Sequence, residues 1–168
     1  PFDFSQILDE VPEIRKFAFK IDTYSFEPPI DSSDVEPSLW QDLARLIKEK
    51  YEDYDGFIIL HGTDTMSYSA SALSFMLDGL TKPVIFTGSQ LPIGVPRTDG
   101  RENLISAVEI ASAKDENGNP AVPEVCVCFA SLLMRGNRST KVNSEGFRAF
   151  QSPNFPPLAE AGINIRYN

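Results

Sequence analysis

Gly56-Phe-Ile-Ile-Leu-His-Gly-Thr-Asp-Thr-Met66 indicates the fold of this chain more clearly than any other segment. An apolar run, 57–60, ends directly in polar residues, and a segment compatible with a helix, 67–77, follows without a spacer. A buried parallel strand that leads through a tight turn into a helix has this pattern. Such a turn places two hydroxyls and a carboxylate beside the unpaired N–H groups that open the helix, where polar ligands are stabilised.

The same alternation of strand and helix continues along the chain. Apolar stripes and punctuating Pro and Gly residues predict helices that open at Pro37 and near residue 102. An alternation of basic and apolar residues predicts a strand at 15–21. Apolar runs predict strands at 84–86 and, as the last clear strand, at 125–129. This order predicts an α/β fold with an open, mostly parallel sheet and helices on both faces, as in flavodoxin-like and Rossmann-like domains.

Length and composition set the domain expectation. With 168 residues, 42% of them hydrophobic, one domain with a substantial core is expected. Three prolines, at positions 153, 156 and 157, mark its end. The sequence therefore predicts a domain over residues 1–157, with residues 158–168 as the domain end or a linker.

Charge and the supply of ligand side chains argue against several classes of partner. The net charge of −9 disfavours nucleic acid and anionic membranes, and no apolar run approaches the roughly 20 residues of a membrane span. Cys126 and Cys128 fall within an apolar run, and His61 is the single histidine, so no metal site is predicted. The dinucleotide, P-loop and nucleophile-elbow motifs are also missing, and no cofactor is expected.

Short polar groups follow the predicted strands. They are Asp31-Ser32-Ser33, Thr63-Asp64, Thr87-Gly88-Ser89-Gln90 and Ser131. Ligands of open α/β sheets bind beyond the carboxyl ends of the strands. These groups are therefore expected to converge on one site, although the sequence assigns Ser131 no role in it.

Thr63, Asp64 and Lys141 each have two interpretations. Thr63 and Asp64 either cap the following helix or form part of a reactive site, because a threonine becomes nucleophilic once a base takes its proton. Lys141 is either a solvated surface lysine or that base, with Asp64 as its partner. The residues alone leave these alternatives open.

Four motifs together closely resemble the bacterial-type L-asparaginase family, and most closely its cytoplasmic type I branch. They are Asp31-Ser-Ser-Asp34, His61-Gly-Thr-Asp-Thr-Met66, Thr87-Gly-Ser-Gln90 and Asp99-Gly-Arg-Glu-Asn-Leu104. The resemblance runs from about residue 18 to residue 157. The family's first catalytic threonine, in a Gly-Gly-Thr-Ile segment, has no counterpart in these 168 residues, and neither does its second domain.

This resemblance implies an L-asparagine amidohydrolase that yields aspartate and ammonia. It implies that Thr63, Asp64 and Lys141 form a Thr–Lys–Asp triad, in which Asp64 also binds the α-amino group of the substrate. Asp31, Ser32 and Ser33 would hold the α-carboxylate and the amino group. It further implies a cytoplasmic enzyme, assembled as a dimer of dimers, of which this chain is the incomplete N-terminal domain.

Other functions stay open for the same motifs. A glutaminase or a glutamyl-tRNA amidotransferase subunit would share the strand-end residues. A non-catalytic, flavodoxin-like binding module could hold the phosphate of FMN in a hydroxyl-rich strand–helix turn.

Overall fold

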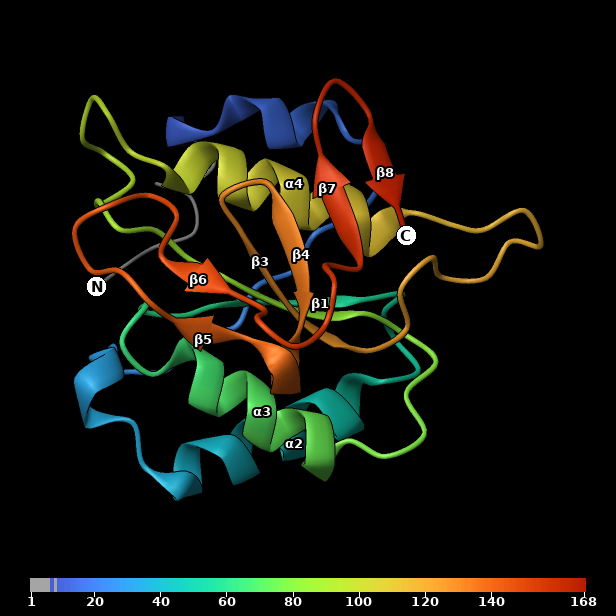
Figure 1. Cartoon of the computed structure of the whole chain (residues 1–168). Helices are drawn as coiled ribbons and strands as arrows, with labels where there is room; N and C mark the ends of the chain where they lie inside the picture. The colour runs from blue at the N-terminus through green and yellow to red at the C-terminus, as the bar shows by residue number, and fades with distance from the viewer. Residues whose placement is uncertain (1–6, 8) are drawn as a thin grey trace.

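A six-stranded mixed sheet with helices on both faces organises the chain (Figure 1). The computed structural model describes residue 7 and residues 9–168. In spatial order the strands are β1 (Phe57–Leu60), β2 (Val84–Thr87), β3 (Val125–Phe129), β4 (Leu132–Arg135), β7 (Ala159–Ala161) and β8 (Ile165–Tyr167). The first three are parallel, and each later neighbour pairs antiparallel. A separate two-stranded ribbon joins β5 (Thr140–Lys141) to β6 (Phe150–Gln151).

Helices cover both faces of the sheet. Figure 1 shows α2 (Pro37–Lys50) and α3 (Met66–Met76) below the strands and α4 (Gly100–Ser112) above them. Proline opens α2, where its missing N–H costs nothing, and Leu43 and Ile47 form the buried stripe of that helix. The predicted α/β architecture, an open sheet with helices on both faces, is confirmed, and the parallel part of the sheet is formed by β1, β2 and β3.

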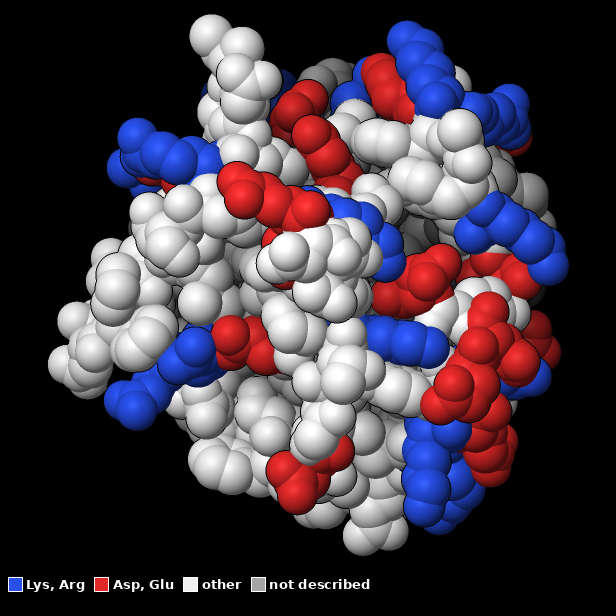
Figure 2. All heavy atoms as spheres, turned by 90° about the vertical axis from the view of Figure 1, so that its right-hand side faces the viewer, with Lys and Arg blue, Asp and Glu red and all other residues white. Residues whose placement is uncertain are grey.

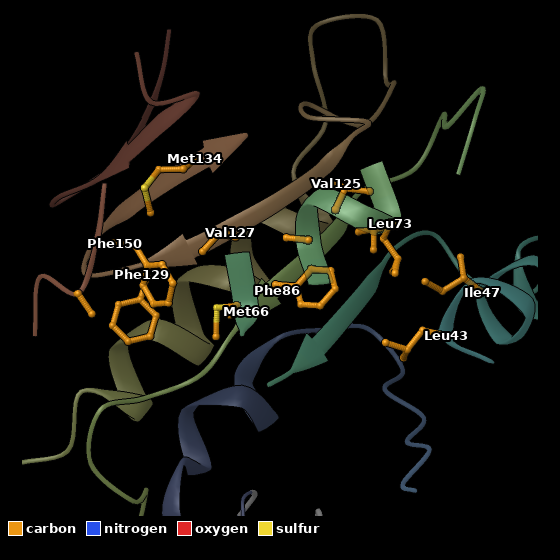
Figure 3. Close-up of a cluster of buried hydrophobic side chains, with 13 residues drawn as sticks. Leu43, Ile47, Met66, Leu73, Phe86, Val125, Val127, Phe129, Met134 and Phe150 are labelled. Atoms are coloured by element: carbon orange, nitrogen blue, oxygen red, sulfur yellow. The ribbon is translucent and has the colours of Figure 1, made fainter. Parts of the chain in front are cut away.

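Alternate residues of the central strands supply the two cores. Phe86 packs with α2 and α3 in the cluster of Figure 3, whereas its neighbour Ile85 packs against α4. Both side chains are fully buried. A strand covered on both faces must be apolar throughout, which explains the uninterrupted runs in β2 and β3.

Most predicted elements are confirmed to within two residues, but the strand expected at 15–21 is wrong. Residues 12–16 form the 3₁₀-helix η1, opened by Pro12, and Ile14 packs with residues of α4. Arg15 and Lys16 are exposed, and Arg15 forms an ion pair with Asp9. A basic and apolar alternation has therefore produced one buried contact on a helical turn instead of a strand.

The strand β3 is not the last. A two-residue turn, Ala130-Ser131, with φ of 48° and 68°, leads directly into β4. Such turns favour Asn and Gly, so this turn carries no sequence signal. Residues 158–168, predicted as a domain end or linker, supply β7 and β8 at the far edge of the same sheet.

The surface mixes charges of both signs. Acidic and basic side chains are interspersed on the face seen in Figure 2. Among the described helices, none is both long and apolar enough to cross a membrane.

We expect Ile85→Ala to lower the free energy of unfolding by about 2–5 kcal/mol, because a fully buried side chain leaves a cavity between β2 and α4. The matched control is Ile163→Ala, since Ile163 is fully exposed, and its effect should stay within about 0.5 kcal/mol. Urea titrations compare the two variants. Equal midpoints would contradict the assigned core.

Candidate active site

Thr63, Asp64 and Lys141 lie together beyond the carboxyl end of β1. The Nζ atom of Lys141 lies 2.9 Å from Thr63 Oγ1 and 2.8 Å from Asp64 Oδ1. Thr63 and Asp64 belong to the turn between β1 and α3, whereas Lys141 reaches them from the ribbon strand β5. The Lys141 side chain is 19% exposed and that of Asp64 is 62% exposed, so the amine is sheltered while the carboxylate faces solvent.

The turn that carries Thr63 is not explained by capping alone. Thr65 is the residue before α3, and it makes no capping hydrogen bond with its side chain. Its hydroxyl instead donates to the carbonyl oxygen of Ser32 at 2.6 Å. Thr63 and Asp64 direct their side chains to Lys141. The capping interpretation therefore does not describe the contacts of these three residues.

The Asp31-Ser32-Ser33 loop packs against the same turn. Ser32 is buried, and a Cβ atom at Gly62 would lie 2.3 Å from its hydroxyl oxygen, so only glycine allows this approach. One oxygen of the Asp31 carboxylate accepts from the backbone N–H and the hydroxyl of Ser33, both at 2.9 Å. These hydrogen bonds, chiefly the backbone one, lower the pKa of Asp31. The predicted site residues thus form two neighbouring groups.

The ends of β1 and β2 also lie unusually close together. A Cβ atom at Gly88 would lie 2.2 Å from the carbonyl oxygen of His61, which forbids any side chain there. The backbone N–H of His61 donates to Thr87 O at 2.9 Å. This contact extends the β1–β2 pairing into the polar segments and brings Gln90 to Thr63, with 3.0 Å between Gln90 Oε1 and Thr63 Oγ1.

His61 has a structural place behind the site. Its Nδ1 lies 2.6 Å from Gly62 O, and its Nε2 lies 2.9 Å from the hydroxyl of Ser69, which itself accepts from Trp40 Nε1 at 2.8 Å. A carbonyl can only accept, so Nδ1 carries the proton and Nε2 accepts from Ser69. Burial lowers the pKa of His61, which favours this neutral tautomer.

Two residues that organise the site, Gln90 and Asn103, lie in motifs that the sequence singled out, but the sequence assigned neither of them a role. Asn103 is buried; its Nδ2 donates to Gly88 O at 2.9 Å, and its Oδ1 accepts from the backbone N–H of Ala130 at 3.0 Å. It thereby links the ends of β2 and β3. The polar group after β2 includes Gln90, and the Asp99-to-Leu104 motif includes Asn103. These motifs indicated where the two residues lie in the sequence, but not which groups they contact.

Ser131 stays outside these contacts. Its carbonyl oxygen accepts from the backbone N–H of Ala161 at 2.8 Å, so the polar residue after β3 contributes to the pairing of β4 with β7.

Within residue 7 and residues 9–168, no group of three or more His, Cys, Asp or Glu side chains gathers to hold a metal ion. Burial raises the pKa of Cys128 to about 12, which keeps this thiol protonated.

Comparison with known proteins shows where this arrangement belongs. The family model described as "Asparaginase, N-terminal" matches residues 1–168. The chain belongs to the asparaginase family. It is 52% identical over 155 residues to L-asparaginase 1 of Escherichia coli K12, covering 92% of this chain and 43% of that protein. It is also 48% identical over 142 residues to the 60 kDa lysophospholipase of Mus musculus, covering 84% of this chain and 24% of that protein.

A solved asparaginase has the same fold. L-asparaginase I from Vibrio cholerae matches with a TM-score of 0.87 and 46% identity, and the match covers 100% of this chain and 49% of that one. The chain spans about half the length of this asparaginase. The resemblance to type I asparaginases noted in the sequence is therefore confirmed.

We expect the imidazole of His61 to titrate below its ordinary pKa of 6.5, because burial disfavours the charged ring. The unfolded chain then binds this proton more readily, so the contribution of His61 to stability is full above about pH 6.5 and is lost as the pH falls through the lowered value. The ring resonances in NMR spectra report the midpoint, and His61→Gln assigns them. A midpoint at or above 6.5 would show that the ring is not held neutral by its surroundings.

Proposed function

We propose that the natural polypeptide carrying these residues hydrolyses the side-chain amide of L-asparagine to aspartate and ammonia. The observation that carries the proposal is the placement of Lys141 Nζ within 2.9 Å of Thr63 Oγ1 and 2.8 Å of Asp64 Oδ1, in a chain of the asparaginase family. The arrangement supplies a hydroxyl, a base and a carboxylate, which amide hydrolysis by a threonine requires. No cofactor enters this proposal.

Thr63 and Lys141 are the proposed proton carriers. In its neutral form the Lys141 amine takes the proton of Thr63, which either attacks the amide carbon or activates another nucleophile. The same proton then goes to the departing ammonia, and a water molecule supplies the oxygen of the new carboxylate. We assign the oxyanion to the backbone N–H groups that open α3, because the first turn of a helix leaves N–H groups without an intrahelical partner.

Asp64 and the Asp31-to-Ser33 loop are the proposed substrate-holding groups. The Asp64 carboxylate is 62% exposed, so it is accessible to the α-ammonium group of an amino acid while it stays bound to Lys141. Ser32 and Ser33 have hydroxyls suited to a carboxylate. The Asp31 carboxylate, whose pKa is lowered, stays charged at neutral pH and suits an ammonium group.

The setting of the enzyme is also a proposal. We infer that these residues form the N-terminal domain of a longer cytoplasmic enzyme that assembles as a homo-oligomer, by resemblance to type I asparaginases. The match to an N-terminal family model and the half-length match to a solved asparaginase support the first part. Three large apolar side chains on α3, those of Tyr68, Phe75 and Met76, are exposed and suit burial against a second copy.

Thr63→Val and Lys141→Met are each expected to lower kcat for asparagine by about 100- to 10,000-fold, because each removes one end of the proton transfer. Thr23→Val and Lys50→Met alter exposed residues away from the site and serve as matched controls. Ammonia release by the natural polypeptide is the measurement. Near-normal turnover in either site variant would remove that residue from the mechanism.

Substrate preference separates the asparaginase proposal from its alternatives. Asparagine should be hydrolysed at least about 100-fold more efficiently than glutamine, since one added methylene moves the amide away from Thr63. The comparison uses kcat/KM with both amides, together with a lysophospholipid, because one relative is named a lysophospholipase. Preference for glutamine or the lipid would overturn the assignment, as would a bound flavin in the purified protein.

The oligomer is tested by Phe75→Glu, which places a charge on the exposed apolar face of α3. We expect the variant to lower the molar mass in sedimentation, because burying an unpaired carboxylate opposes association. Ile163→Glu, at a fully exposed turn residue, is the control and should leave the mass unchanged. A wild-type monomer would contradict the proposed assembly.

A further inference from the structure

Gln90 occupies a fixed position at the end of β2. Its backbone N–H lies 3.0 Å from both carboxylate oxygens of Asp99, and the N–H of Leu91 lies 3.2 Å from one of them. Asp99 immediately precedes α4, and Asn103 on that helix donates to the same carboxylate at 3.3 Å. The backbone of Gln90 is therefore anchored to α4, so its side chain projects from a rigid base.

The contacts of the Gln90 side chain determine which way its amide points. Its Nε2 lies 3.2 Å from Gly146 O and 3.5 Å from Asn143 O. Carbonyl oxygens only accept hydrogen bonds, so the donating Nε2 must face this turn and Oε1 must face Thr63. The Thr63 hydroxyl is consequently the donor in its 3.0 Å contact with Gln90.

This orientation determines the direction in which the hydroxyl proton of Thr63 points. Because the proton points to Gln90, a lone pair of the Thr63 oxygen faces Lys141, whose Nζ donates to it at 2.9 Å. The hydroxyl is thus held from both sides, and Lys141 completes the chain by donating to Asp64. Gln90 is the only acceptor for the Thr63 proton among the described hydrogen bonds of that hydroxyl.

The turn that Gln90 contacts belongs to the same ribbon as Lys141. The side-chain oxygen of Asn143 accepts from the backbone N–H groups of Glu145 and Gly146, at 2.8 and 3.1 Å, which gives the turn a defined shape. Val142 N donates to Ala149 O at 2.8 Å, directly beside Lys141. One amide thus joins the turn after β1, which carries Thr63, to the ribbon that carries Lys141.

We propose that Gln90 is a positioning residue: it accepts a hydrogen bond from the resting Thr63 hydroxyl and ties the 143–146 turn to the site, so that Thr63 and Lys141 keep their separation. The catalytic half of this inference rests on the proposed amide hydrolysis, whereas the structural half does not. Gln90 acts through Thr63 and Lys141 and is assigned no contact with the reacting atoms.

Two substitutions separate the acceptor from the donor of the Gln90 amide. Gln90→Met removes both at similar length, and Gln90→Glu keeps the acceptor for Thr63 but cannot donate to Gly146 O. Gln41→Met, on the exposed surface of α2, is the matched control. The variants are made in the natural polypeptide, and thermal unfolding verifies that each is folded.

The kinetic readout is the division between kcat and KM. For Gln90→Met we expect kcat for asparagine to fall about 10- to 100-fold, while KM changes less than about threefold, because the substrate-holding loop at 31–33 is untouched. In Gln90→Glu the added negative charge disfavours loss of a proton from Lys141, so the acidic limb of the pH–rate profile should move to higher pH. An unchanged kcat in Gln90→Met, or a change confined to KM, overturns the catalytic half.

Hydrogen exchange at the Val142 amide tests the structural half without any substrate. Both Gln90 variants should raise its exchange rate about tenfold, since neither can donate to the turn, and Gln41→Met should not. Equal exchange in wild type and both variants overturns the tie, whatever the activity. If wild type releases no ammonia from asparagine, the proposed function and the catalytic half fail together, while this exchange result still decides the structural half.

Discussion

The parallel pairing of β1 with β2 is the constraint on which the candidate site depends. It sets Leu60 opposite Thr87 and continues through the hydrogen bond from His61 N to Thr87 O. Since side chains alternate between the faces of a sheet, a slip of one residue would exchange the two cores and separate Thr63 from Gln90. Only glycine at position 88 is compatible with this register, because any larger residue would collide with the backbone of His61.

Burial explains why so much of this frame was predictable from the sequence. The strands β2 and β3 and the helices α2, α3 and α4 each bury an apolar run or stripe, and β1, at the edge of the sheet, packs a partly buried apolar run against the same cores. Such patterns are readable without tertiary information. The strands β4, β7 and β8 were missed for a different reason. A turn such as Ala130-Ser131 contains neither Gly nor Asn, and β7 and β8 have three residues each, too few for a periodic signal. Their pairing is decided by the edge that β3 and β4 provide.

The residues of the site differ in the same way: some could be predicted from local sequence, and others could not. The turn at Thr63 and Asp64 follows from local sequence, because a strand, a polar turn and a helix are consecutive. Lys141 does not, since nothing in a lysine two residues before an asparagine distinguishes a base from a solvated cation. Only the fold brings the ribbon of β5 and β6 over the end of β1, and only resemblance to a family assigned that lysine a role beforehand. Gln90 was placed near the site by the polar group after β2, but its role was not, because the partners of its side chain are distant in the sequence in both directions.

The ion pair between Lys141 and Asp64 contributes little to stability. An ion pair with one partner as exposed as Asp64 contributes little to folding, because water screens the carboxylate and side-chain entropy opposes the pairing. We infer instead that the Asp64 carboxylate serves two cations, Lys141 and the ammonium group of the substrate. If the substrate ammonium binds Asp64 as proposed, two cations compete for one carboxylate, and their mutual repulsion favours loss of a proton from Lys141. Substrate binding would then convert Lys141 from the donor seen beside Thr63 into the acceptor that attack requires, so the base would become available when the amide is in place.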